Sequence, residues 1–150
     1  MSSNPPAPAN LFKQIALAKA MRVSVSGYSS GCLELTAPLR PNINDKGTAF
    51  AGSISSLLVL AGWGLVTLRL KEAGIQAEVV VSKSETDYRN PVRSDMRSIA
   101  EVSNGQIDPL ISDLAENQRG RIKIQSRLFS QGKQCATMTA HYVVFPSKSS

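Results

Sequence analysis

The feature that most restricts the fold is a long uncharged segment, Ala49–Leu68, with the sequence AFAGSISSLLVLAGWGLVTL. Its 20 residues are enough to cross the hydrocarbon core of a bilayer as a helix. Serine, threonine and glycine residues interrupt the apolar run, however, and its flanks lack an aromatic belt. We therefore expect a soluble helix that is buried on nearly every side, and no membrane partner.

The residues before this segment alternate between helical and strand patterns. Apolar residues at helical spacing predict a short helix over Leu11–Ala20, and period-two alternation predicts two strands joined as a hairpin. The strands are expected at Met21–Val25 and Cys32–Ala37, with a turn over Gly27–Gly31. The loop Arg40–Lys46 then leads, through Gly47 and Thr48, into the long helix, which should end near Gly74.

After Gly74 the pattern is that of strands rich in β-branched residues. Four strands are expected, at Ala77–Tyr88, Asp95–Ser103, Arg121–Ser130 and Lys133–Phe145. The last two should form a hairpin around Gln131–Gly132, and His141 in the last strand is interpreted as a structural residue. Asp108 and Pro109 predict the cap and first residue of a short helix that ends at Asn117.

This order of elements predicts one α+β domain over residues 1–150, with polar tails at about 1–10 and 146–150. A single helix that is apolar on all sides needs cover, and one curved antiparallel sheet can wrap most of its circumference. Such a sheet still has two edge strands, and the helix keeps one uncovered face. We therefore expect a homodimer, or a dimer of dimers, that covers both.

Charge and cysteine content limit the partners and the compartment. A net charge of +6 (17 − 11) favours an anionic partner. Because Lys and Arg are scattered and only eight aromatic residues occur, we expect no nucleic-acid partner. Cys32 and Cys135 lack CxxC spacing and cannot complete a zinc site with His141, so we expect no metal and reduced thiols in the cytoplasm.

Two segments resemble a known family. PNINDKGTAFAGSISSLLVLAGWGL (Pro41–Leu65) and SKSETDYRNPV (Ser82–Val92) are similar to the YiiD-type thioesterase domain, which has the hotdog fold, and the likeness covers nearly the whole chain. The resemblance implies an enzyme that hydrolyses acyl-CoA or acyl-carrier-protein thioesters, with CoA entering as part of the substrate and no separate cofactor. A hotdog module that binds acyl thioesters without hydrolysing them is the alternative.

The chemistry of a thioester agrees with the residues at the start of the long helix. Hydrolysis needs donors for the developing oxyanion, a group that activates water, and cations for the phosphates of the carrier. Gly52 lies where the helix begins and free backbone N–H groups are available, and the small Ala51 beside it allows close approach. Ser53 and Ser56, on the first turns, are candidates to position water. Small residues that only pack the helix against the sheet are the alternative for Gly52.

A pattern from phenylacetate-pathway hotdog thioesterases, Asn-x-x-Gly-x-x-His-Gly-Gly, matches this chain in part, with Phe50 and Ala51 replacing its His and first Gly. The matching positions are Asn44, Gly47 and Gly52, and the resemblance adds Thr48 to the residues expected to contact substrate. The carboxylate that this type carries in the helix would fall at Val59, and no Asp or Glu occurs from Thr48 to Leu70. The resemblance therefore implies either another acid or a domain that only binds.

Asp45 is the nearest replacement for the missing acid, because it lies beside Asn44 in the loop. An Asx turn or a helix cap is the alternative role for this residue. Glu85 and Asp87, on alternate residues of one strand, are further candidates for the base. For the carrier phosphates we expect Arg89 and Arg93, with Arg119 and Arg121 as the other possibility.

Overall fold

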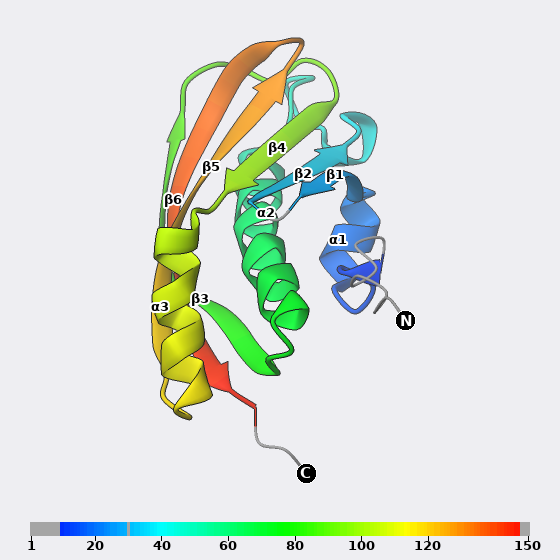
Figure 1. The fold of residues 1–150 in the computed structure, drawn as a ribbon. Helices are drawn as coiled ribbons and strands as arrows, with labels where there is room; N and C mark the ends of the chain where they lie inside the picture. Colours follow the sequence, from blue (N-terminus) through cyan, green and yellow to red (C-terminus); the bar gives the residue numbers. More distant parts are fainter. Residues whose placement is uncertain (1–9, 30, 148–150) are drawn as a thin grey trace.

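The computed structural model describes residues 10–29 and 31–147. Its elements follow one another in the order expected from the sequence, with one long helix between a hairpin and four further strands (Figure 1). The elements are α1 (Ala16–Met21), β1 (Ser24–Ser29), β2 (Cys32–Ala37), η2 (Arg40–Asn42), α2 (Ala51–Glu72), β3 (Ala77–Tyr88), β4 (Met96–Glu101), α3 (Asn104–Ala115), β5 (Gly120–Ser130) and β6 (Lys133–Pro146).

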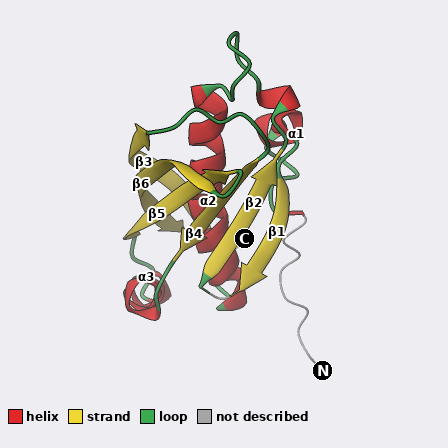
Figure 2. Cartoon of the chain, turned by 90° about the horizontal axis from the view of Figure 1, so that it is seen from above, coloured by secondary structure: helices red, strands yellow, loops and turns green. Residues whose placement is uncertain are grey.

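The six strands form one antiparallel sheet in the order β1-β2-β4-β5-β6-β3. The sheet curves around α2, which lies in its concave side and contacts every strand from β2 to β6 (Figures 1 and 2). The α+β class and the wrapped central helix are therefore as predicted. The hairpin of β5 and β6 also forms as predicted, and Gln131 and Gly132 turn it with positive φ angles of 54° and 74°.

Hydroxyl groups of the sheet hold α2 at a defined position along the strands. Ser98, Ser126 and Tyr142 donate hydrogen bonds to three successive carbonyls of the helix, those of Leu57, Leu58 and Val59, at 3.0, 3.1 and 2.7 Å. Buried polar groups are retained where they are paired in this way. The three bonds, with the apolar core around them, determine where the N-terminus of α2 lies relative to the ends of the strands.

The helix α2 is long and apolar because it forms the centre of the hydrophobic core. This helix is the one element of the described residues that is long and apolar enough to cross a membrane, and 56% of its most apolar window is buried inside the protein. The side that the sheet leaves open is covered in part by the N-terminal segment, where the rings of Phe12 and Trp63 lie 6.1 Å apart. Trp63 also donates a hydrogen bond to the carbonyl of Val79 on β3.

The predicted start of α3 is wrong. The helix begins at Asn104, capped by a capping box in which Ser103 Oγ accepts from the Gln106 N–H and Gln106 Oε1 accepts from the Ser103 N–H. Pro109 lies inside the helix rather than at its first residue, which removes one backbone hydrogen bond. The capping box and three buried side chains, Ile107, Leu110 and Leu114, offset that loss.

Other boundaries shift for local reasons. Gly27 belongs to β1, at a bulge where the pairing with β2 changes register, so the hairpin turn is shorter than predicted. At the N-terminal end the helix α1 is shorter than predicted and begins at Ala16. Pro146 is the last residue of β6, opposite Ala77, instead of part of a tail. The remaining tail predictions, at 1–9 and 148–150, lie outside the described residues. His141 is exposed on β6.

Candidate functional site

The N-terminus of α2 is open. The cap residue, Phe50, makes no side-chain hydrogen bond to the helix, and no acidic residue occurs in the first turn. The N–H groups of Ser53 and Ile54 donate to the carbonyl of Phe50 at 3.0 and 3.1 Å. Among the described residues the N–H groups of Ala51 and Gly52 have no acceptor. These two adjacent donors, at the positive end of the helix dipole, are suited to a carbonyl oxygen that gains negative charge.

The loop before α2 is closed by Asn44. Its Oδ1 accepts from the N–H groups of Lys46 and Thr48 at 2.8 and 3.0 Å, and its Nδ2 donates to Thr48 Oγ1 at 2.9 Å. Gly47 turns the loop with a φ of 82°, a region that favours glycine. The helix therefore begins at Ala51 rather than at Gly47 and Thr48, because those two residues complete the turn. Every polar atom of the Asn44 amide is engaged in the loop.

A hollow of about 350 Å³ lies beside this helix end. The loop, the first turn of α2 and the end of β3 with the segment after it form its walls. The lining residues are Asn44, Ala49, Ala51, Ile54, Tyr88, Arg89, Asn90, Pro91 and Val92. Three of the predicted site residues, Asn44, Ala51 and Arg89, therefore meet in one place. Sequence reasoning missed Tyr88 and Asn90, although both belong to the segment that carries the family resemblance.

Hydrogen bonds to backbone carbonyls hold the two walls of the hollow together. The N–H of Ala49 donates to the carbonyl of Val92 at 2.9 Å, and the Tyr88 hydroxyl donates to the carbonyl of Ala51 at 3.3 Å. The N–H groups of Arg89 and Asn90 both donate to the carbonyl of Cys135, at 2.8 and 3.1 Å. The hollow is thus tied to the sheet through β6 and to the helix through Tyr88.

Phe50 covers the position at which Gly52 was expected to be open. A Cβ atom at Gly52 would collide with the ring of Phe50, which is 57% exposed. The absence of a side chain at Gly52 therefore makes room for this ring. Since the ring is largely in solvent, it can turn away without disturbing the core, and it stands at the entrance to the two free N–H groups.

Asp45 lies at the tip of the loop, and its side chain is 82% exposed. Its carboxylate pairs with Lys46 Nζ at 3.2 Å. It does not contribute to the lining of the hollow. In this arrangement an Asp45 carboxylate that activates water would have to leave Lys46 and turn toward the helix end.

Glu85 and Asp87 lie on the face of the sheet that points away from α2. Their partners on β6 are Thr139 and Thr137, whereas the buried Met138 between these threonines faces the helix. Successive side chains of a strand point to opposite faces, so both carboxylates are on the outer face. The geometry therefore separates them from the free N–H groups. Asp87 instead approaches Arg89, with 3.7 Å between Oδ2 and Nη2.

The remaining predicted residues do not line the hollow: one is an exposed arginine near it, and two are serines on the first turns of α2. Arg93 is exposed and does not line the hollow. Ser53 and Ser56 are half-buried on the first turns of α2, and neither side chain has a hydrogen-bond partner among the described residues. Ser55, between them, donates to the carbonyl of Gly52 at 3.1 Å.

Within the described part of the chain, no group of three or more His, Cys, Asp and Glu side chains is arranged to hold a metal ion. The lining of the hollow contains amides, one phenol, one guanidinium and apolar groups, with no carboxylate or imidazole. The arrangement can bind and polarise a carbonyl, and it can hold an acyl chain against Ile54 and Val92. A proton acceptor must come from outside the lining.

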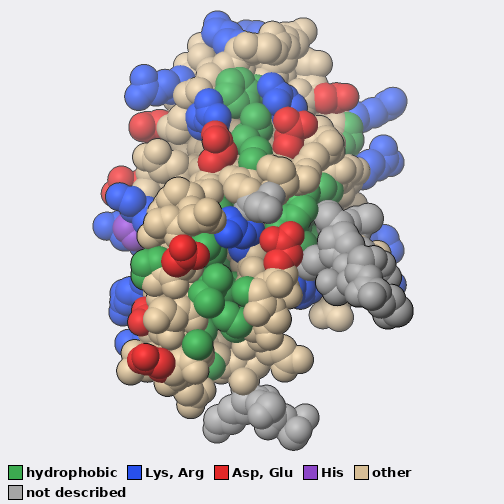
Figure 3. All heavy atoms as spheres, in the orientation of Figure 1, with side chains coloured by type: hydrophobic (Ala, Val, Ile, Leu, Met, Phe, Trp, Pro, Cys, Tyr) green, Lys and Arg blue, Asp and Glu red, His purple; other side chains and the backbone are tan. Residues whose placement is uncertain are grey.

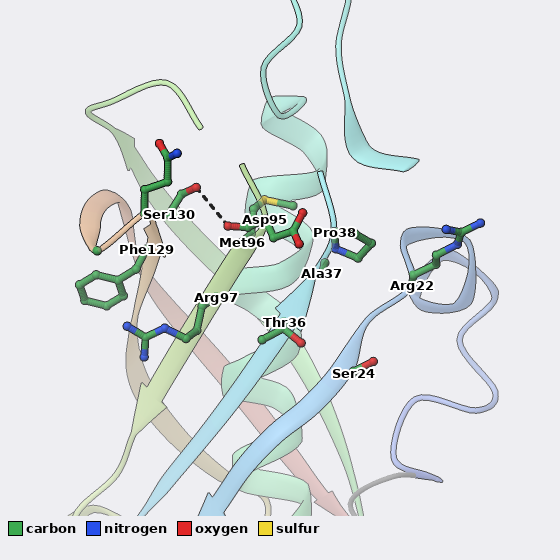
Figure 4. A pocket seen from close by; sticks show the side chains of 12 residues that line it. Arg22, Ser24, Thr36, Ala37, Pro38, Asp95, Met96, Arg97, Phe129 and Ser130 are labelled. Atoms are coloured by element: carbon green, nitrogen blue, oxygen red, sulfur yellow. Dashed lines mark hydrogen bonds between the residues drawn. The ribbon is translucent and has the colours of Figure 1, made fainter. Parts of the chain in front are cut away.

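A second hollow, of about 440 Å³, opens on the outer face of the sheet (Figure 4). Its floor is a row of side chains in register across four strands, Ser24, Thr36, Arg97 and Phe129. Arg97 is already engaged there, because it stacks on Phe129 at 5.1 Å and donates to Glu34 Oε1 at 2.8 Å. None of the predicted site residues lines this hollow.

Comparison with known protein families identifies one match. The family described as "Putative thioesterase (yiiD_Cterm)" matches residues 8–146 of the chain. The match includes the loop, the first turn of α2 and the segment that follows β3.

Solved structures with the same fold agree with that match. A putative thioesterase from Shewanella oneidensis is 29% identical with a TM-score of 0.84, covering 93% of this chain and 94% of that one. A protein of unknown function from Chlorobaculum tepidum is 26% identical with a TM-score of 0.88, covering 93% of each chain. A probable thioesterase from Pseudomonas aeruginosa, at 20% identity, shares the fold, with a TM-score of 0.83 and coverage of 98% and 99%.

Proposed function

Because the chain belongs to the family of putative thioesterases described as yiiD_Cterm, with the hotdog fold, we propose that it hydrolyses the thioester of an acyl-CoA or an acyl-carrier protein. The observation that carries the proposal is the pair of free N–H groups at Ala51 and Gly52, at the edge of a hollow with apolar and amide walls. Two aligned backbone donors stabilise an oxyanion more in the transition state than in the ground state, which is what raises turnover.

The proposed general base is Asp45, acting through water. It is the acidic residue of the loop that leads into α2, and its exposed side chain is free to rotate away from Lys46. Asn44 supports the site by holding the loop, and Gly47 and Thr48 complete the turn that leads to the free N–H groups. Ser53 and Ser56, without hydrogen-bond partners in the described chain, are proposed to hold the water.

We also propose that the active form is a homodimer, or a dimer of dimers, with the hollow next to the subunit contact. The edge of β3 has no partner strand in the sheet. Exposed large apolar side chains gather along this edge and the nearby helix end, namely Phe50, Val80, Val81 and Tyr88. Exposed edges and apolar patches of this kind are commonly covered by a second subunit.

For the carrier we propose that Arg89 and Arg93 meet the phosphates of CoA, and that no separate cofactor takes part. Arg89 lines the hollow, and Arg93 is exposed on the segment that continues its wall. Guanidinium groups bind phosphate with two parallel hydrogen bonds, which suits this role. The free thiols of Cys32 and Cys135 support our proposal of a cytoplasmic protein.

One observation favours a second function. The lining of the hollow has no carboxylate or imidazole, and Asp45 is paired with Lys46 outside it. A module that binds acyl thioesters without hydrolysing them would need the apolar walls and the N–H donors but no base. This is the alternative that the activity test has to separate from the hydrolase.

The test is release of free thiol from a panel of acyl-CoAs of different chain length by the purified full chain. We expect hydrolysis of at least one member, and we expect Asp45→Asn to lower turnover by about 10²-fold or more with little change in binding, the usual share of a general base. Asp108→Asn, at an exposed position on α3, is the matched control and should retain full rate.

Each outcome has a clear meaning. Full activity of Asp45→Asn would show that Asp45 is only a turn residue. Absence of hydrolysis across the panel, together with saturable binding of CoA, would replace the hydrolase by the binding module. Thermal unfolding of both variants monitors folding, and Asn is nearly isosteric with Asp at this exposed position.

A further inference from the structure

The outer face of the sheet carries a row of basic side chains in register. Lys83 on β3 is opposite His141 on β6, and His141 is opposite Lys123 on β5. Arg121, two residues before Lys123, points to the same face. All four side chains are exposed. We name Lys83, His141, Lys123 and Arg121 the basic row.

No acid neutralises the basic row within the described residues, and none of its side chains makes a hydrogen bond or ion pair there. The nearest carboxylate on this face of β3, Glu85, is opposite Thr139 rather than opposite a member of the row. Lys83 and Lys123 lie on the two strands on either side of β6, about two strand spacings apart. Their positive charges and that of Arg121 gather on this part of the outer face without an ion-pair partner among the described residues, which favours an anionic ligand there.

Three members of the row border a small hollow of about 190 Å³. Arg121, Lys123 and His141 line it together with Ser82, which lies where β3 bulges and its pairing with β6 shifts register. Ser82 donates a hydrogen bond to the carbonyl of His141 at 3.1 Å, and this contact fixes the bulge. In Figure 3 the single histidine, in purple, lies at the edge of the view against blue side chains.

We propose that the basic row is a binding site for a phosphate group that carries more than one negative charge. Arg121 and Lys123 line the hollow, and Lys83 follows its lining residue Ser82 on β3, so three cationic side chains are placed to meet the oxygens of one phosphoryl or diphosphoryl group. The 440 Å³ hollow on the same face is a weaker candidate, because Glu34 already neutralises its Arg97. Pairing of β3 edges in a dimer leaves the row open, since hydrogen bonds between strands lie in the plane of the sheet.

The same chemistry is available from a free phosphate or from the nucleotide end of CoA. The inference does not depend on thioester hydrolysis, because it concerns the opposite face of the sheet from the N-terminus of α2. Its test therefore uses no acyl substrate, and its failure would leave the proposed activity untouched.

The experiment is a titration of the isotope-labelled full chain with inorganic pyrophosphate at low salt, followed by amide NMR shifts. We expect saturable shifts at residues 82–83, 121–123 and 141. The double variant Lys83→Gln/Lys123→Gln should weaken binding by about tenfold or more, as expected for the loss of two charge-assisted contacts. Lys13→Gln/Lys19→Gln removes the same charge from exposed positions near the N-terminus and should bind as the wild type does.

Stability provides a second readout. Without ligand, Lys83→Gln/Lys123→Gln should unfold at the same or a higher temperature than the wild type, because the change removes two exposed charges that have no ion-pair partner among the described residues. Pyrophosphate should raise the unfolding temperature of the wild type and of the Lys13/Lys19 control, but not that of the row variant.

Repeating the titration with CoA distinguishes the two sources. Shifts at the same amides and competition with pyrophosphate would identify the nucleotide end of CoA as a ligand of the basic row. CoA shifts confined to the residues beside α2 would instead identify free phosphate or diphosphate as the ligand of the row. Equal weakening in both double variants would indicate only the overall positive charge, and would overturn the proposal. Pyrophosphate shifts that do not saturate, or that fall elsewhere, would also overturn it.

Discussion

Two predicted site residues near the N-terminus of α2 have structural roles: they hold the loop and the first turn of the helix in place. Asn44 carries the expected amide, but all of its hydrogen-bonding capacity holds the loop. Gly52 carries no side chain because the ring of Phe50 occupies that space. Both residues still contribute to the site, since together they determine where the free N–H groups point. In the proposed function they would act on substrate indirectly, through the position of the first turn of α2.

Glu34 provides a prediction at this scale. It accepts hydrogen bonds from Ser26 at 2.6 Å and from Arg97 at 2.8 Å, and these bonds hold its carboxyl pKa below the ordinary value. Glu34→Gln should lower the free energy of unfolding at pH 7 by up to about 1 kcal/mol, because the group is partly exposed. Urea unfolding of both proteins measures the difference.

The difference should disappear in acid. Above the pKa of an unfolded Glu, about 4.3, the carboxylate is ionised in both states and its bonds contribute in full. As the pH falls through the lower pKa of the folded state, the carboxylate is protonated and the contribution is lost. A difference that stays constant from pH 7 into the acid range would contradict this account. Glu116→Gln, at an exposed helix end, serves as the control.

Among the elements, α2 determines the geometry of the site. Hydroxyl groups from β4, β5 and β6 bond to three successive carbonyls of its second and third turns, so its N-terminal end cannot slide along the sheet. The small residues of α2 allow this close approach. At Gly62 a Cβ atom would collide with the hydroxyl of Tyr142, the same group that bonds to the carbonyl of Val59.

Gly62→Ala should therefore lower the free energy of unfolding by about 1–3 kcal/mol, the usual cost of an extra methyl group in a packed core. Gly105→Ala on α3 is the matched control, because its added methyl would meet its nearest neighbour, Ser103, at an ordinary 3.7 Å. That variant should be unchanged or stabilised by up to about 1 kcal/mol, through the better helix propensity of alanine. Chemical unfolding of the two variants compares them, and a neutral Gly62→Ala would refute the close contact.

At the scale of the whole molecule, exposed apolar residues are unevenly distributed. Phe50, Val80, Val81 and Tyr88 lie along β3 and the end of α2, where the sheet also ends without a partner strand. The partly exposed side of α2 that includes Val59 and Trp63 is close to the same edge, since Trp63 bonds to Val79 of β3. One contact with a second subunit would cover the edge of β3, the partly exposed side of α2 and these apolar side chains together.

Val81→Glu is therefore expected to convert the proposed dimer into a monomer at micromolar concentration. Val81 is 47% exposed, so the substitution places a charge in the subunit contact without opening the core. Leu17→Glu on α1, at a residue that is 58% exposed, is the control and should leave the mass in solution unchanged. Light scattering coupled to gel filtration reports both masses. A wild type that is already monomeric would remove the basis of the proposal.

The sequence by itself determined the class of fold and indicated where to look for the candidate site. A long uncharged helix among alternating strands has few ways to be buried, and a sheet wrapped around it is the one that this order of elements allows. The strand β3 has the predicted bounds, because its alternation and flanking turn residues are local signals. Where two local signals indicate different start residues for a helix, the sequence alone does not show which one prevails. At α3, Asp108 and Pro109 are typical of a helix start, yet the helix begins at the capping box of Ser103 and Gln106.

Only the tertiary structure decided which candidate groups meet. Asn44, Ala51 and Arg89 come together because hydrogen bonds to backbone carbonyls join the loop, the helix end and the end of β3. Such long-range contacts leave no periodic trace in the sequence. The same packing turns Glu85 and Asp87 to the outer face, through the register of β3 with β6. It also brings Lys83, His141 and Lys123 into one row. Register depends on partners that are far apart in the chain, so spacing along one strand cannot reveal it.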